Sequence, residues 1–109
     1  MSELSVKDLI GRLPAAFISE KSAGVNAVVQ LKITGEGGGD WVVTIQNKTC
    51  RVQDGVVPNP DLEFEGGAST VLDVFTGKTD GMQAFMQGKL VLRGNIGLAM
   101  KLANLFKTA

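Results

Sequence analysis

The sequence predicts an α+β domain in which helices cover one face of a five-stranded, mostly antiparallel sheet. Two observations predict this class. Residues 27–55 contain three runs in which apolar and polar side chains alternate, which is typical of strands with one buried face. Apolar side chains recur at helical spacing near the start of the chain and again in its last third. We expect the 109 residues to form a single domain, residues 1–109, because they are too few for two.

The first helix is expected over residues 6–13, where apolar side chains follow the helical period. Ser5 and Asp8 stand three residues apart at its start, as in a weak capping box. Pro14 is expected to end or restart this helix, because proline lacks the backbone N–H that a helix interior needs. Residues 15–18 would then form a second apolar piece.

A three-stranded meander is expected next, because each alternating run is followed by turn-forming residues. The first strand covers residues 27–34 and ends at the glycine-rich segment 35–40. The second covers residues 41–47, and a tight turn at residues 47–48 leads to the third at 49–55. The glycine-rich segment opens no helix and lacks the Lys-Ser/Thr pair of a phosphate-binding loop, so we interpret it as a hairpin turn.

Two strands and three helices are expected in the second half of the chain. A fourth strand at residues 61–66 precedes a helix at 69–75. A short helix at residues 81–88 precedes the fifth strand at 89–94, and a final helix covers residues 96–106.

Three side chains in this half are candidate helix N-caps, namely Ser69, Asp80 and Asn95. Gly94 and Gly97 are expected to shape the turn between the fifth strand and the last helix, because glycine accepts backbone conformations that other residues avoid.

The last helix is apolar over about twice the width of the stripe that an ordinary surface helix buries. Its apolar residues are Ile96, Leu98, Ala99, Met100, Leu102, Ala103, Leu105 and Phe106. Only a narrow strip that contains Lys101 and Asn104 is polar. Such a helix should be covered on two sides, and the sheet of the same domain accounts for one of them.

The charges are balanced overall but unevenly placed. Lys plus Arg equals Asp plus Glu at 11 each, so the net charge gives no indication of a nucleic-acid partner. Asp80 is the last acidic residue, and Lys89, Arg93, Lys101 and Lys107 follow it. This basic C-terminal quarter suits transient contact with an anionic membrane surface. It equally suits a solvated helix edge whose lysines complement the helix dipole, so both interpretations stay open.

The residue types argue against an enzyme and against a metal site. The sequence has no His and no Tyr, and Cys50 is its one cysteine, so neither a Ser–His or Cys–His nucleophile nor a zinc cage can form within the chain. Glu63 and Glu65 are two residues apart on a predicted strand, where a solvated outer face is expected rather than an acid/base pair. We therefore expect no catalysis and no cofactor.

A cytoplasmic location is expected. One cysteine allows no internal disulfide and is compatible with a reducing compartment. The first residues lack the apolar run of a signal peptide. No stretch approaches the roughly 20 apolar residues of a transmembrane helix.

The apolar residues of the short helix and the last helix admit two interpretations. Together with the apolar residues of the last helix, Met82, Phe85 and Met86 of the short helix are more apolar side chains than one side of a sheet ordinarily buries. They could simply fill the core, or they could line a cavity for an acyl chain, which flexible methionines suit. Composition and spacing do not choose between these interpretations.

A series of short motifs along nearly the whole chain bears on this choice. The motifs are Pro14 with Phe17, residues 24–30, residues 33–35, Trp41, Pro60-Asp61, Gly77-Lys78 and residues 88–102. In order and in element type, they resemble the sterol carrier protein 2 family, also called nonspecific lipid-transfer or sterol-binding domains. The resemblance implies a five-stranded sheet covered by helices, with an apolar tunnel between them that the last helix roofs.

The resemblance also implies a function. It implies binding of a fatty acid, a fatty acyl-CoA, a sterol or a phospholipid, with low selectivity. The candidate lining residues occupy the inward positions of the matching elements. They are Phe17, Trp41, Val43, Ile45, Phe75, Met82, Phe85, Met86, Leu98, Leu102, Leu105 and Phe106. Gln83 or Gln87 is a candidate polar contact for a lipid head group.

A second hypothesis from another class is a non-catalytic interaction module. In this hypothesis the last helix docks a partner subunit or a second copy of the chain, as a homodimer, and the cavity is small or empty.

The sequence carries no peroxisomal tail and ends soon after Phe106, where longer relatives add a further segment. The tunnel mouth would then be more open, or it would be completed by a second chain.

Overall fold

The computed structural model of the chain describes residues 5–76 and 78–105. The candidate lining residue Phe106 lies outside the described residues, and so does the side chain of Phe75. The elements in chain order are α1 (Val6–Ala16), the 3-10 helix η1 (Ser19–Lys21), β1 (Ala27–Thr34), β2 (Gly39–Gln46), β3 (Thr49–Asp54), β4 (Leu62–Gly67), α2 (Ala68–Phe75), α3 (Gly81–Met86), β5 (Leu90–Gly94) and α4 (Ile96–Ala103).

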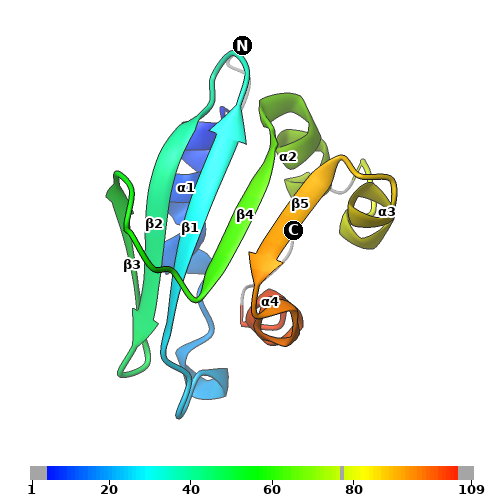
Figure 1. Cartoon of the computed structure of the whole chain (residues 1–109). Coiled ribbons are helices and arrows are strands. Elements are labelled where there is room, and N and C mark those ends of the chain that lie inside the picture. The colour runs from blue at the N-terminus through cyan, green and yellow to red at the C-terminus, as the bar shows by residue number, and fades with distance from the viewer. Residues whose placement is uncertain (1–4, 77, 106–109) are drawn as a thin grey trace.

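The five strands form one sheet in the order β3-β2-β1-β4-β5 (Figure 1). β1 pairs with β4 in parallel, while the pairs β1–β2, β2–β3 and β4–β5 are antiparallel. The predicted α+β class with a mostly antiparallel, five-stranded sheet is confirmed. The one parallel pair is a feature that alternation along single strands could not reveal.

The strand register brings apolar side chains together on one face of the sheet. Val29 in β1 lies opposite Val43 in β2 and Leu62 in β4, and Leu31 lies opposite Phe64 in β4. Successive side chains of a strand point to opposite faces, so these five share a face. The buried residues of the helices pack against this inner face, and α1 lies behind the sheet in Figure 1.

Two apolar clusters fill the space between the inner face and the helices. The α2 cluster consists of Val6, Ile10, Ile33, Trp41, Ala68, Val71, Ala84 and Leu90. The α4 cluster consists of Ala27, Val29, Val43, Ile45, Leu62, Leu102 and Leu105. Leu13, Leu31 and Val52 are partly buried against both clusters and therefore join them.

The first helix begins as predicted and ends later than predicted. The Ser5 hydroxyl accepts a hydrogen bond from the Asp8 amide at 3.1 Å, and the Ser5 amide donates to the Asp8 carboxylate at 3.2 Å. Pro14 lies inside α1, so the prediction that it ends or restarts the helix is wrong. Proline sits in the last turn, where it removes a single helical hydrogen bond, while burial of Val6 and Ile10 holds the helix against the sheet.

The predicted N-caps of α3 and α4 are confirmed. The Asp80 carboxylate accepts from the Met82 amide at 2.9 Å, and the Asn95 side chain accepts from the Leu98 amide at 3.1 Å. Ser69 is not the cap of α2, because β4 continues to Gly67 and the helix begins directly after it.

The turn from β5 to α4 requires glycine at position 94. Gly94 has a φ of +100°, and a Cβ atom there would lie 2.6 Å from the carbonyl oxygen of Asp61. The Asn95 amide donates to the same carbonyl at 3.1 Å. The start of α4 is therefore held against the start of β4. α4 ends at Ala103 with Asn104 as its C-cap, which is earlier than the predicted end at residue 106.

On the outer face of the sheet, the connection from β3 to β4 crosses β2 and β1 (Figure 1). Gln30 in β1 is buried beneath it and makes hydrogen bonds in both directions. Its amide nitrogen donates to the carbonyl oxygens of Trp41 at 3.1 Å and Gly55 at 3.0 Å, and its amide oxygen accepts from the Val57 amide at 2.8 Å. These hydrogen bonds fix the connection to the sheet. The alternation of β1 alone predicts that Gln30 faces solvent, whereas the connection covers it.

Candidate functional site

The α4 cluster brings together half of the predicted lining residues. Those within it or packed against it are Phe17, Val43, Ile45, Leu98, Leu102 and Leu105. Val43, Ile45, Leu102 and Leu105 are buried, while Phe17 and Leu98 are partly buried. Trp41 is buried in the neighbouring α2 cluster. Sheet and last helix therefore face each other across an apolar layer, as the sequence predicted.

The helix over this layer is held at both ends by backbone hydrogen bonds. At its start, the Asn95 amide donates to the carbonyl oxygen of Asp61, the residue directly before β4. After its end, the carbonyl oxygen of Leu105 accepts from the amide of Ile18 at 2.7 Å. Ile18 follows α1, so the segments next to the first and last helices meet at this point.

The apolar layer offers no buried polar atom to orient a ligand. Among the described residues, Ser22 and Gln30 are the buried polar ones, and no buried side-chain nitrogen or oxygen lacks a hydrogen-bond partner. The Ser22 hydroxyl donates to the carbonyl oxygen of Ser19 at 2.7 Å, and Gln30 lies on the outer face. A molecule bound in this layer would be recognised by its apolar area and shape rather than by fixed hydrogen bonds.

Three predicted lining residues lie on the solvent side of α3 instead. Met82 is 47% exposed, Phe85 37% and Met86 77%. Ala84 faces the core and is fully buried in the α2 cluster. The structure therefore does not gather these three side chains into the interior with the other candidates.

The second side of α4 is also open to solvent. Ile96 is 40% exposed and Met100 57%, whereas Leu102 faces the sheet. The sequence predicted cover on two sides of this helix, and the described part of the chain supplies cover on one. Gln83 and Gln87, the candidate head-group contacts, are exposed as well.

The titratable groups of the sheet do not form an acid/base site. Glu63 and Glu65 lie on the outer face, where Arg93 Nη1 contacts their carboxylates at 2.7 and 3.0 Å and Lys32 contacts Glu63 at 3.1 Å. Hydrogen bonds from Arg93 and Lys32 hold the pKa of Glu63 below its usual range. Sequence reasoning placed the glutamates correctly but missed their partners, because register between strands is not visible in the sequence.

Cys50 is half-buried, and desolvation raises the pKa of its thiol to about 11. A thiol with such a pKa is protonated at neutral pH and is a poor nucleophile. Within residues 5–76 and 78–105, no group of three or more acidic, Cys or His side chains is placed to hold a metal ion. No helix in the described ranges is long and apolar enough to cross a membrane.

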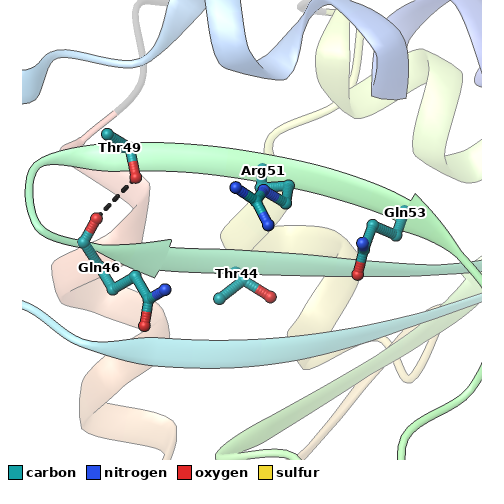
Figure 2. A pocket seen from close by; sticks show the side chains of 5 residues that line it. All are labelled: Thr44, Gln46, Thr49, Arg51 and Gln53. Carbon is teal, nitrogen blue, oxygen red and sulfur yellow. Dashed lines mark hydrogen bonds between the residues drawn. The ribbon is translucent and has the colours of Figure 1, made fainter.

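Two shallow hollows lie on the outer face, away from the apolar layer. One, of about 70 Å³, is lined by Thr44, Gln46, Thr49, Arg51 and Gln53 on β2 and β3 (Figure 2). The other, of about 310 Å³, is lined by Pro58, Asn59, Pro60, Glu63, Arg93 and Gly94. Neither corresponds to the tunnel, which stays a prediction.

A family model described as the SCP-2 sterol transfer family matches residues 7–107. The chain belongs to this family. Bovine sterol carrier protein 2 is 42% identical over 73 residues, which cover 65% of this chain and 13% of that protein. Mouse hydroxysteroid dehydrogenase-like protein 2 is 36% identical over 80 residues, covering 72% of this chain and 16% of that protein. The chain thus spans a small part of these two relatives.

A solved SCP-2 domain matches over almost its full length. The NMR structure of palmitated SCP2L2 from Aedes aegypti superposes with a TM-score of 0.74 at 32% identity, covering 92% of each chain. The α+β fold and the membership of the SCP-2 family, which the sequence motifs predicted, are thereby confirmed. Half of the lining residues that the resemblance to this family implies lie in the α4 cluster or pack against it.

Proposed function

We propose that this SCP-2 domain binds a long-chain lipid between the inner face of the sheet and α4 and carries it through water. The ligand class is a fatty acid, a fatty acyl-CoA, a sterol or a phospholipid. The observation that carries the proposal is the α4 cluster, an apolar layer on three strands that is covered by α4 and flanked by Leu13 of α1 and by Phe17, and that contains no buried polar anchor among the described residues. Membership of the SCP-2 sterol transfer family supports it.

The energetics favour acyl chains of considerable length. Burial of each CH₂ group contributes about 0.8 kcal/mol, so the apolar part of a sixteen-carbon chain contributes roughly 12 kcal/mol when fully buried. Association and ordering cost several kcal/mol of that gain, about 4 or more. The remainder corresponds to micromolar affinity or somewhat weaker, about 6 to 8 kcal/mol. An affinity in this range holds a lipid in water and still allows its release.

Uptake of a lipid requires movement of α4. Leu102 and Leu105 fill the space above the sheet, so a ligand must displace them or repack them. The helix is short, and besides its packing on the sheet it is held by the Asn95–Asp61 and Ile18–Leu105 backbone hydrogen bonds next to its two ends. We propose that α4 swings away from the sheet while the strands stay paired.

The domain acts as a carrier without catalysis in this proposal, and we place it in the cytoplasm. The thiol of Cys50 is protonated at neutral pH, and the glutamates of the outer face are occupied by Arg93 and Lys32. Turnover of a fatty acyl-CoA by the purified chain would contradict the non-catalytic assignment.

The test is native mass spectrometry of the purified protein, followed by solvent extraction and identification of the lipids. We expect one lipid per chain, which is lost on delipidation and regained on titration with palmitate. A mass equal to that of the bare chain, unchanged by palmitate, palmitoyl-CoA, cholesterol and phosphatidylglycerol, would refute the carrier function.

A second function, protein docking through α4, is favoured by the exposure of Ile96 and Met100 on the helix face away from the sheet. In that case the partner is another subunit or a second copy of the chain. Size-exclusion chromatography with light scattering separates the two: a stable lipid-free dimer that Met100→Glu converts to monomer would favour docking over lipid carriage.

A further inference from the structure

A row of apolar side chains in the middle of the inner sheet face stays partly exposed. It crosses β1, β4 and β5 and consists of Leu31, Phe64 and Leu92. Leu31 lies directly opposite Phe64, and Phe64 lies directly opposite Leu92, so the three side chains are adjacent and share the inner face. We call these three residues the open row.

The open row is bordered by buried residues on both sides. Toward the α4 cluster, Val29 and Leu62 are buried two residues away along β1 and β4. Toward the α2 cluster, Ile33 and Leu90 are buried two residues away along β1 and β5. Leu31 packs against both clusters. The exposure is therefore confined to one row on a face that helices otherwise cover.

The open row runs inward from one edge of the sheet and ends at Trp41. Leu92 lies in β5, which is an edge strand (Figure 1). At the other end, Trp41 in β2 lies directly opposite Leu31 and is 8% exposed. The indole lies over the backbone of Gly39, because a Cβ atom there would be 2.9 Å from its Cη2 atom. The row thus has an outer end at the β5 edge and an inner end at the indole.

The dimensions of the open row suit one acyl chain. Side chains that share a face along a strand are about 6.6 Å apart, so a row one side chain wide is too narrow for an α-helix of about 10 to 12 Å diameter. From β5 to β2 the row crosses three strand spacings of about 4.8 Å, or about 14 Å in all. An extended carbon chain with bonds of about 1.5 Å advances by about 1.25 Å per atom, so this length holds about eleven carbon atoms.

Other lipids are broader than the open row. A sterol nucleus is a rigid plate several carbon atoms wide, and the two chains of a phospholipid lie side by side. The buried residues around the row also offer no polar partner: among the described residues, the buried polar side chains are Ser22 and Gln30, and both are already hydrogen-bonded. A polar group at the inner end would lose its hydrogen bonds to water without replacement, so a head group stays at the β5 edge.

We propose that the ligand is a lipid with a single acyl chain, whose tail lies across the strands along the open row with its methyl end against Trp41. The carbon atoms nearer the head group then lie next to α4, which follows β5 and packs on the sheet. This inference rests on the carrier function proposed above and narrows its ligand class. Fatty acids and fatty acyl-CoAs fit the row, whereas sterols and two-chain phospholipids do not.

Quenching of fluorescence tests the position of the tail, because Trp41 is the one tryptophan of the chain. The probes are palmitate brominated at its terminal carbon and palmitate brominated next to its carboxylate. Bromine quenches an indole that it contacts, and contact requires about 4 to 4.5 Å between heavy atoms, so we expect at least about threefold more quenching from the terminal bromine at saturation. Equal quenching by the two probes, or stronger quenching by the second, would overturn the proposed position.

Recovery of the fluorescence tests the selectivity. Palmitate is expected to displace the terminally brominated probe and restore the emission of Trp41. Cholesterol and dioleoyl phosphatidylglycerol are expected to need a concentration at least about tenfold higher, which corresponds to about 1.4 kcal/mol of binding free energy. Displacement by either lipid at the concentration that suffices for palmitate would overturn the selectivity for a single chain.

Two consecutive residues of β5 provide a matched pair of variants. Leu92 faces the open row opposite Phe64, whereas Val91 lies on the outer face opposite Glu65 and is 36% exposed. Leu92→Asn is expected to weaken palmitate binding about fivefold or more, because it places an amide in the path of the tail, and Val91→Asn should leave binding within about twofold. Leu92→Phe keeps the row apolar but fills part of it, and should weaken binding about threefold or more.

Thermal unfolding identifies which variants fold, and palmitate affinity is compared among those. A folded variant at position 92 that binds palmitate as tightly as the unchanged chain would overturn the proposal. Native mass spectrometry separates this inference from the carrier function. One palmitate per chain with equal quenching by the two brominated probes would refute the position of the tail alone, whereas a chain that takes up none of these fatty acids would refute the carrier function itself.

Discussion

Replacement of Leu102 by alanine tests whether the α4 cluster is the lipid site. Leu102 is 7% exposed and contacts the sheet side of α4. The change removes three carbon atoms, which costs about 2.4 kcal/mol in transfer free energy. The cavity that it leaves raises the loss to about 3 kcal/mol or more. For a domain with a total stability of about 5 to 15 kcal/mol, the variant still folds.

Palmitate should restore much of that loss, because its acyl chain occupies the space that Leu102 vacates. A ligand at a hundred times its Kd stabilises the folded state by about 2.7 kcal/mol. Leu90→Ala is the matched control: Leu90 is also buried, but it belongs to the α2 cluster. Urea unfolding, followed by the fluorescence of Trp41, gives the free energy of unfolding of the unchanged chain and of the two variants, each with and without palmitate. We expect the largest gain from palmitate in Leu102→Ala.

Equal gains from palmitate in the Leu102 and Leu90 variants would refute this reasoning, because a lipid bound over the α4 cluster should distinguish them. A gain confined to Leu90→Ala would place the lipid under α2 and α3 instead.

Three further predictions concern single residues. Gly94→Ala should lower the free energy of unfolding by roughly 2 kcal/mol or more in urea denaturation, because φ is +100° and the new Cβ would lie 2.6 Å from the Asp61 carbonyl oxygen. Gln30→Leu should cost about 2 to 3 kcal/mol in the same assay, because it removes the side-chain hydrogen bonds to the buried Trp41 carbonyl and to the part-buried Gly55 carbonyl and Val57 amide. Burial raises the pKa of Cys50 to about 11, so its reaction with a disulfide reagent should stay slow at pH 8 and accelerate only toward pH 11. Because the thiol of the unfolded chain ionises first, this group favours the folded state fully below about pH 9 and progressively less as pH rises toward 11, which pH-dependent unfolding would show.

The strands, their inward residues and most helix starts could be predicted from the sequence, because these depend on neighbours along the chain. Alternation placed β1 to β3, and short-range hydrogen bonding placed the Ser5, Asp80 and Asn95 caps. The parallel pairing of β1 with β4 could not be predicted, because it depends on residues far apart in the sequence. The same applies to the contacts of Arg93 with the two glutamates of β4.

The candidate site shows the same division. The residues of the α4 cluster were predictable as inward positions of strands and of a strongly apolar helix. The orientation of α3 was not, because Met82, Phe85 and Met86 have the spacing of an inward face and the helix buries Ala84 instead. In a helix of six residues, the attachment to neighbouring strands decides which side faces the core, and the apolar period does not.

The hydrogen bond between the Ile18 amide and the Leu105 carbonyl oxygen has a kinetic consequence. The bond closes a loop that contains most of the chain. The entropic cost of closing this loop is therefore incurred only when the residues after α4 dock against the segment after α1. Contacts of this kind form late in folding and open early in the native state, whereas the antiparallel β1–β2–β3 meander is local. Amide hydrogen exchange should therefore be faster in α4 than in β1 and β2. A domain built in this order can release its C-terminal helix repeatedly without losing its sheet.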